Sequence, residues 1–225
     1  MRPFAVPAAL LMCTLACGVA CGSGPAAEPQ PSSASRTTGD VGTVNPARIE
    51  RARQDLPPGY EVVPIEPQAT PVSLWGFGPD WRADPAACGA LVAREVEPTR
   101  GWSASGPGGI VYAGVSKLGP GVPADRRDPP CEQWSVSGGH SVGTVTAVAG
   151  PQIEDAVTAG MSTAVTTIVE GGTETRSHAD TFTADLGAGY HVFVSVVTDP
   201  GSPNPALDPT FASDLLVKTV SALRG

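Results

Sequence analysis

Residues 163–200, TAVTTIVEGGTETRSHADTFTADLGAGYHVFVSVVTDP, decide the fold of this 225-residue chain. β-Branched residues fill three segments of the stretch, and two glycine-rich breaks separate them, at Gly171-Gly172 and at Gly187-Ala188-Gly189. β-Branched runs favour strands, and glycine breaks between them favour turns. The stretch therefore predicts a meander of three antiparallel strands.

Beyond the meander, a proline-stiffened loop leads into a segment with a different period. Apolar side chains recur there at helical spacing, at Phe211, Leu215, Leu216, Val217, Val220 and Leu223. This spacing predicts a helix over 209–223 that lays an apolar stripe on the sheet.

Upstream of the meander, short apolar runs predict further strands, over residues 60–65, 102–105, 110–118, 133–137 and 142–148. The first of these is expected at an edge of the sheet, because Pro64 lacks the amide donor that a central strand needs. Residues 151–162 suit a helix or a strand, and we favour a strand.

Near the start of the domain, Asn45-Pro46 supplies a helix cap followed by proline, and Pro57-Pro58 ends the segment. We expect a short, solvent-facing helix there and a brief helical turn over 88–92. Antiparallel strands with helices at the chain ends predict one α+β domain over 45–225. Its twisted antiparallel β-sheet would carry a C-terminal helix on one face, two layers in all.

The first 24 residues, MRPFAVPAALLMCTLACGVACGSG, combine one Arg, an apolar run and small residues before a cysteine. The run is short for a membrane span, which favours a signal peptide over residues 1–20. Val19-Ala20-Cys21-Gly22 resembles a bacterial lipobox, although Gly18 stands at its aliphatic position. Cys21 is therefore the expected lipidation site. Lipidation at Cys17 and ordinary secretion after Ala20 remain alternatives.

Residues 21–44, which begin at Cys21, are rich in Pro, Ser, Gly, Thr and Ala and have almost no bulky apolar side chain. Such a composition cannot form a packed core, so we expect a disordered tether. The expected location is the extracytoplasmic face of the cell membrane, with the lipid anchor as the contact with the membrane.

Charge excludes one class of partner. The full chain has a formal net charge of −8, and removal of residues 1–20 takes away Arg2 and no acid, which leaves −9. The only lysines are Lys117 and Lys218. Nucleic-acid binding needs clustered basic residues, so we expect none. No phosphate-binding glycine loop leads into a helix, and we expect no cofactor.

Cys88 and Cys131 are the cysteines that remain when the signal and the anchor are set aside. An exported chain meets an oxidising environment, so these two are expected to pair. The disulfide would close a loop of 131 minus 88, or 43, residues. A loop of that length gives roughly 4 kcal/mol of stabilisation by chain entropy.

Three large rings, Trp75, Phe77 and Trp81, lie among glycines and prolines in residues 72–88. Two interpretations stay open. The rings form a satellite core on the disulfide, or they form the rim of a ligand groove.

One motif matches an enzymatic signature. Gly139-His140-Ser141-Val142-Gly143 fits the GxSxG nucleophile elbow, with Asp155 or Asp180 and His178 or His191 as formal partners of Ser141. The elbow needs a strand-to-helix turn, whereas both flanks here have strand character. We therefore expect a hairpin tip, and a secreted serine hydrolase acting through Ser141 remains the alternative function.

Metal binding is not expected. The three histidines, His140, His178 and His191, show no paired spacing. Four residues with side-chain oxygens could present them to calcium, namely Asp199, Ser202, Asn204 and Asp208. They lack the EF-hand spacing that calcium loops use.

Several stretches together resemble a known family. They are LPPGYEV at 56–62, LWGFGPDWRADPAAC at 74–88, CEQW at 131–134, IVEGG at 168–172 and LLVKTVSALR at 215–224. The chain resembles short mycobacterial lipoproteins of unknown function and, more distantly, the PknH-like extracellular sensor domain. The sensor domains have a twisted sheet with a cleft and typically two disulfides, whereas this chain has cysteines for one.

The expected anchor, the tether and the aromatic residues 72–88 predict a cell-envelope lipoprotein whose extracytoplasmic domain binds a ligand or protein partner and catalyses no reaction. We expect a monomer.

Overall fold

The computed structural model describes residues 43–92, 98–118, 131–198 and 201–225. The expected signal peptide, Cys21 and all of the expected tether except its last two residues lie outside the described residues.

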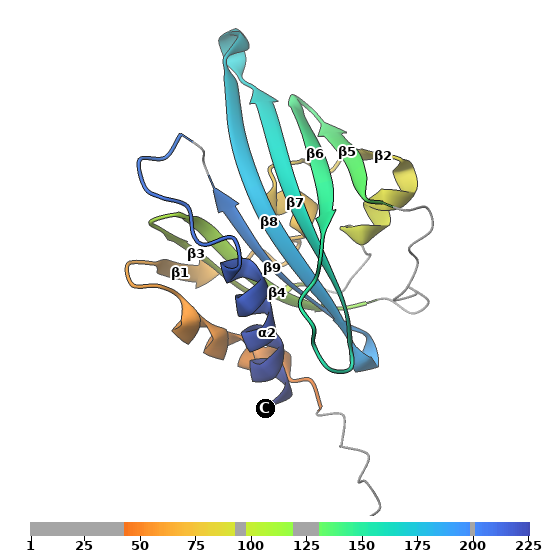
Figure 1. The fold of residues 1–225 in the computed structure, drawn as a ribbon, viewed down its shortest axis with the longest axis vertical. Helices are drawn as coiled ribbons and strands as arrows, with labels where there is room; N and C mark the ends of the chain where they lie inside the picture. Colours follow the sequence, from red (N-terminus) through yellow and green to blue (C-terminus); the bar gives the residue numbers. More distant parts are fainter. Residues whose placement is uncertain (1–42, 93–97, 119–130, 199–200) are drawn as a thin grey trace, which may run out of the picture. The chain divides into compact units, whose positions relative to one another are not determined.

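Within these ranges, nine strands form one open antiparallel sheet (Figure 1). Their order is β1-β3-β4-β9-β8-β7-β6-β5-β2. The strands are β1 (Glu61–Pro64), β2 (Arg82–Asp84), β3 (Arg100–Gly106), β4 (Gly109–Lys117), β5 (Gln133–Gly138), β6 (Ser141–Val148), β7 (Ala156–Ile168), β8 (Glu174–Leu186) and β9 (Tyr190–Thr198). The α+β class is confirmed, and β1 lies at an edge as its proline predicts.

The meander β7-β8-β9 forms the middle of the sheet, as the opening stretch predicts. Gly171 and Gly172, both with positive φ, make the first turn within the short helix η3 (Glu170–Gly172). The second turn is η4 (Gly187–Gly189). β7 and β8 have 13 residues each and pair along their whole length, whereas β9 has nine. β8 therefore extends past the end of β9.

Two helices cover part of one face of the sheet, α2 (Phe211–Arg224) and η1 (Pro46–Asp55) (Figure 1). They and the strands below enclose the helix-side core, which comprises Ile49, Ala52, Trp102, Ala104, Val111, Ala113, Val115, Phe182, Ala184, Leu186, Val192, Val194, Val196, Ala212, Leu215, Leu216, Val220 and Leu223. The predicted C-terminal helix and its stripe are confirmed. No helix in the described ranges is long and apolar enough to cross a membrane.

The N-terminal helix differs from its prediction. It is a 3-10 helix, and it is not purely solvent-facing, because Ile49 and Ala52 are buried. Asn45 caps it by accepting a hydrogen bond from the Ala47 amide at 3.0 Å. The Trp102 indole donates to the Ile49 carbonyl at 3.1 Å, which ties the helix to β3.

The opposite face is covered by a largely irregular segment, residues 66–92, which contains α1 (Pro71–Leu74), η2 (Ala86–Leu91) and, at the edge of the sheet, the short strand β2. Its side chains join those of the strands in the aromatic-side core, which comprises Val72, Trp75, Phe77, Cys88, Val92, Trp134, Val136, Val145, Met161, Val165 and Ala179. The sheet thus has cover on both faces, one layer more than the two expected.

Residues 151–162 divide into two parts. β7 begins at Ala156, so the expected strand is confirmed for 156–162, whereas 151–155 form a loop. Asp155 has a φ of 51°, which is incompatible with a strand. The Arg224 guanidinium holds this loop by donating to the carbonyls of Glu154 and Asp155, at 2.7 and 3.1 Å.

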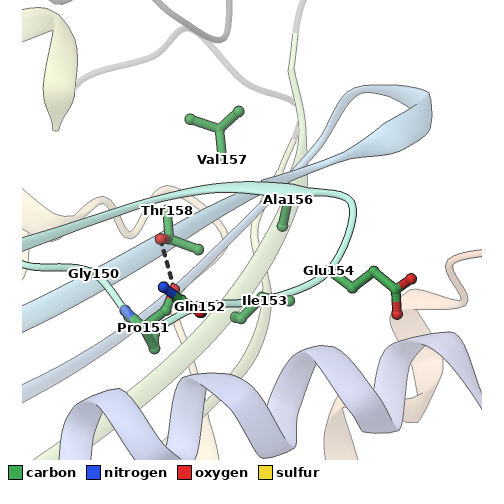
Figure 2. Close-up of a pocket in the computed structure, with 8 residues that line it drawn as sticks. All are labelled: Gly150, Pro151, Gln152, Ile153, Glu154, Ala156, Val157 and Thr158. Carbon is green, nitrogen blue, oxygen red and sulfur yellow. Dashed lines mark hydrogen bonds between the residues drawn. The ribbon is translucent and has the colours of Figure 1, made fainter.

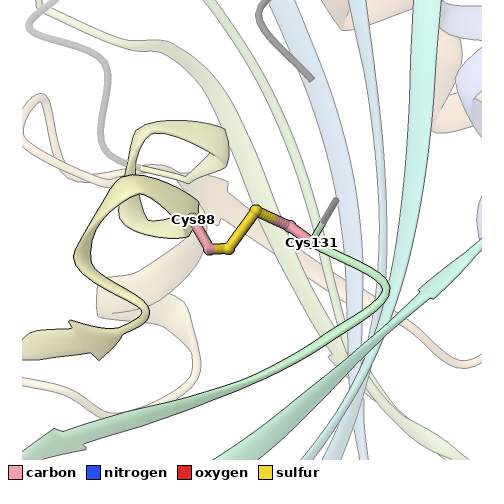
Figure 3. The surroundings of a disulfide bond; sticks show 2 residues. All are labelled: Cys88 and Cys131. Carbon is pink, nitrogen blue, oxygen red and sulfur yellow. A yellow bond between two sulfur atoms is a disulfide. The ribbon is translucent and has the colours of Figure 1, made fainter. Parts of the chain in front are cut away.

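Cys88 and Cys131 form the expected disulfide (Figure 3). It joins η2 to the residues just before β5 and closes a separation of 43 residues. The bond therefore fastens the irregular segment to the sheet.

Candidate functional site

The GHSVG motif forms the turn between β5 and β6. Gly139 has a positive φ at the tip, and Ser141 is the first residue of β6. Ser141 is 7% exposed, and its hydroxyl shares a 2.7 Å hydrogen bond with the Thr167 hydroxyl of β7. The motif is followed by a strand, which is the hairpin geometry that its flanks predict.

His178 lies on the other face of the sheet from Ser141, because it pairs through Ala164 with Thr144 while Ser141 pairs with Thr167. Its Nε2 is 3.1 Å from the Asp180 carboxylate and 3.4 Å from the Ser162 hydroxyl. The hydrogen bond to Asp180, and then its charge, raise the pKa of His178 against an opposing effect of burial. Both neighbours share one ring nitrogen, whereas a catalytic triad uses two.

His191 pairs with Asp185 through Nδ1 at 2.7 Å, and both side chains are buried. Ser141 and Asp185 lie opposite Thr167 and Val157 of β7, ten positions apart, or about 33 Å along the strand. The fold thus keeps the formal partners of Ser141 away from its hydroxyl.

The aromatic rings occupy a packed cluster. Trp75 and Phe77 are buried in the aromatic-side core, and Trp81 is partly exposed. The Trp75 indole donates to the Thr181 hydroxyl at 3.0 Å, and its ring centroid is 6.4 Å from that of Trp134. The rings lie beside Cys88, as a satellite core requires. A ligand groove at these rings stays a prediction.

Three of the four oxygen-bearing residues weighed as calcium ligands, Ser202, Asn204 and Asp208, make hydrogen bonds in the loop before α2. The Ser202 hydroxyl accepts from the Asn204 amide at 3.2 Å. Asp208 accepts from the amide and hydroxyl of Thr210, at 2.8 and 2.7 Å, and these hydrogen bonds lower its pKa. Asp199 lies outside the described residues. Within those residues, no three His, Cys, Asp or Glu side chains are grouped to hold a metal ion.

One large hollow lies in the loop between β6 and β7 (Figure 2). It has a volume of about 690 Å³ and is lined by residues 150–154 and 156–158, which belong to one stretch of the chain. The Thr158 hydroxyl closes the loop by donating to the Pro151 carbonyl at 2.7 Å, and Val157 points away from the neighbouring helix. A shallow hollow formed by a single stretch of the chain offers a ligand few side chains that converge on it.

A second hollow has the better chemistry for binding, and we call it the hairpin pocket. It has a volume of about 570 Å³ and a mostly apolar lining. It lies where the β3-β4 turn meets β8, β9 and the loop before α2. Its lining residues are Ser105, Gly106, Gly108, Gly109, Ile110, Ser177, Val197, Thr198, Ser202, Asn204 and Ala206. Ligand pockets of 300–1,000 Å³ with a few polar groups are the common type.

Glycines allow the pocket to form. A Cβ on Gly109 would lie 2.5 Å from the Val197 carbonyl oxygen, and one on Gly108 would lie 2.9 Å from the Pro205 carbonyl oxygen. Both glycines also have positive φ. The Tyr60 hydroxyl donates to the Pro107 carbonyl at 2.5 Å and braces the turn from outside. Only glycine permits these close approaches of the turn to its neighbours.

The pocket offers no charge to a ligand among the described lining residues. Ile110 and Val197 form apolar surface on one face of the sheet, and hydroxyl and amide side chains surround it. Burying an ionised ligand group without a partner is costly, so the lining favours a neutral ligand. The sequence does not predict this pocket, because its residues come from four strands and a loop, and no local spacing connects them.

The chain is similar to one protein family and to one solved structure. The model of the family described as Domain of unknown function (DUF5642) matches residues 45–224. An X-ray structure of an uncharacterized protein from Mycobacterium smegmatis, an Rv0999 ortholog, is similar with a TM-score of 0.61 and 20% identity. The alignment covers 82% of this chain and all of the other. No curated protein matches. Family and neighbour fit a mycobacterial protein of unknown function.

Proposed function

This chain belongs to the DUF5642 family, and we propose that it is a cell-envelope lipoprotein whose domain binds a neutral ligand or a partner without catalysis. The observation that carries the binding function is the hairpin pocket, with its apolar floor and uncharged described lining. The distant resemblance to PknH-like sensor domains agrees with a binding domain on the outer side of a membrane.

The N-terminal segment supports the location. Residues 1–20 act as the signal peptide, Cys21 carries the acyl chains, and residues 21–44 tether the domain 45–225 to the extracytoplasmic face of the cell membrane. A Ser- and Gly-containing tether of this length has a reach of roughly 25–30 Å. Two or more acyl chains make such anchoring stable, whereas a single chain binds reversibly.

Mass spectrometry of the mature N-terminus tests the anchor. We expect a diacylated or triacylated Cys21 in the membrane fraction and release of the Cys21→Ala variant from it. An unmodified residue 21, or acylation at Cys17, would contradict the proposed anchor.

Binding of Nile red, an uncharged apolar dye, tests the pocket. We expect its fluorescence to rise with the wild-type protein and its affinity to fall at least tenfold in Ile110→Trp, which fills the pocket floor. The matched control is Val63→Trp, because Val63 is 56% exposed on the same face and outside the pocket. Equal affinities of the two variants, or no binding to the wild type, would refute the pocket as a ligand site.

A further inference from the structure

Part of β8 pairs on only one side. β8 pairs with β7 from Glu174 to Leu186, but with β9 only from His178 onward. We call residues 174–177 the β8 edge. No described strand satisfies the backbone donors and acceptors on its second side, and such groups are a template for another strand. Glu174, Thr175 and Arg176 are exposed.

The charges on this edge alternate. Glu174 and Arg176 flank Thr175 and project from the same face of the sheet, because alternate residues of a strand share a face. Their side chains are 55% and 73% exposed and lie 3.6 Å apart. An alternation of this kind is self-complementary under a two-fold axis, because each end of the short segment carries the opposite charge to the other.

We propose that the β8 edge pairs antiparallel with the β8 edge of a second copy of this chain. With the two-fold axis at Thr175, Glu174 lies opposite Arg176 of the second copy, and Arg176 lies opposite its Glu174. Opposite charges facing each other across an antiparallel pair are favourable, and a two-fold contact uses the same residues on both subunits. The proposal therefore predicts a weak dimer, in contrast to the monomer expected from the sequence.

Electrostatics select this register over its neighbours. A shift of two residues toward the turn places Glu174 opposite Glu174 of the second copy, and the opposite shift places Arg176 opposite Arg176. Like charges directly opposite each other destabilise a strand pair. A shift of one residue is also excluded, because it places side chains of opposite faces side by side.

The length of the open edge agrees with the same register. Ser177 is the last unpaired residue before β9, and it faces Thr173 of the second copy, the residue that ends the η3 turn. The second strand therefore turns away beside Thr198, where β9 ends. Gly171 and Gly172 of that turn have no atom within 4 Å of the position that a Cβ would take, so the turn has open space around it.

The interface is short, and interfaces of this size are weak and transient. A covalent trap is the appropriate assay. Residues directly opposite in an antiparallel pair have Cα atoms about 4.5–5.5 Å apart, within the range for a disulfide. Thr175 faces itself in the proposed register, so we expect Thr175→Cys in the full-length chain to give a dimer that reductant dissolves.

Thr173→Cys is the matched control. It is also an exposed threonine on this hairpin, two residues away. In the proposed register it faces residue 177, so two copies of it lie four positions apart, about 13 Å. We expect the cross-linked fraction of this variant to equal that of the wild-type protein. The wild-type value accounts for any cross-linking through the native cysteines.

Charge reversal tests the pairing itself. In the Thr175→Cys background, we expect Arg176→Glu to reduce the cross-linked fraction at least fivefold, because Glu then faces Glu. Adding Glu174→Arg restores the opposite pairs and should restore the fraction. Equal cross-linking of Thr175→Cys and Thr173→Cys, or a double reversal no better than the single one, would overturn the proposal.

Discussion

On one face of the sheet, α2 and η1 pack aliphatic side chains against the strands, and the Trp102 indole is satisfied by a backbone carbonyl. On the other face, the irregular segment 66–92 packs large aromatic rings against the strands, and a disulfide fastens it to the sheet. A regular helix buries a continuous stripe through its own periodicity. An irregular segment has no such stripe, so its cover depends on a few large side chains and a covalent bond.

The largest expected effect is on the helix face. Trp102→Ala removes a side chain with no exposed surface and its hydrogen bond to Ile49, and we expect a loss of about 5 kcal/mol in the free energy of unfolding. Urea unfolding measures it. Val217→Ala, on the exposed side of α2, is the control and should change the free energy by less than about 0.5 kcal/mol. A loss below about 2 kcal/mol would show that this core repacks.

The next effect falls on the aromatic face. Replacing Cys88 and Cys131 together by Ala removes the disulfide, and we expect a loss of roughly 4 kcal/mol in the free energy of unfolding. Hydrogen exchange should show early loss of protection in β5 and η2 while α2 stays protected. Simultaneous loss in α2 would mean that the two cores unfold as one unit.

A smaller change tests the rings. Trp75→Phe replaces a buried indole by a smaller phenyl ring and removes its hydrogen bond to Thr181. We expect a loss of about 2 kcal/mol in the free energy of unfolding. Trp81→Phe is the matched control, because Trp81 is partly exposed, and should cost about 1 kcal/mol or less. If Trp81→Phe proves the more harmful, Trp75 is not the central ring of the cluster.

One substitution should stabilise the aromatic face. The Thr163 hydroxyl is fully buried and has no hydrogen-bond partner among the described residues. Val has the same shape without the polar group, so we expect Thr163→Val to raise the free energy of unfolding by about 1 kcal/mol. Thr219→Val on the helix face should do the opposite, because the Thr219 hydroxyl donates to Leu215 at 2.7 Å. A destabilised Thr163→Val protein would contradict the unsatisfied hydroxyl.

The smallest effect concerns His178, on the helix face beyond the helices. Asp180 raises its pKa above the ordinary value, so folding favours the protonated ring. This contribution is complete below about pH 6.5 and is lost as the pH rises through the higher folded value. The side chain is 39% exposed, so it amounts to less than about 1 kcal/mol.

An NMR titration measures this pKa directly. We expect it to fall in Asp180→Asn and to stay unchanged in Asp185→Asn, whose side chain contacts His191 instead. An unchanged His178 pKa in Asp180→Asn would remove Asp180 as the cause.

The two faces also explain what could be predicted. The C-terminal helix, the meander and most other strands followed from local spacing, whereas α1 and β2 lie in a stretch where glycines, prolines and rings leave no period. The Ser141 hairpin was predictable from its flanks. The hairpin pocket was not, since Ile110 and Val197 are 87 positions apart and meet only through the pairing of β4 with β9.

By itself, the sequence determined the type of most elements, the edge position of the first strand and the disulfide pair. Each depends on local chemistry: a side-chain period, a proline without an amide hydrogen, or a pair of cysteines left when the expected signal and anchor are set aside. Only the tertiary structure decided the order of the strands, the cover on the second face, the hairpin pocket and the unpaired β8 edge. These depend on which distant segments become neighbours, and burial in three dimensions selects those neighbours.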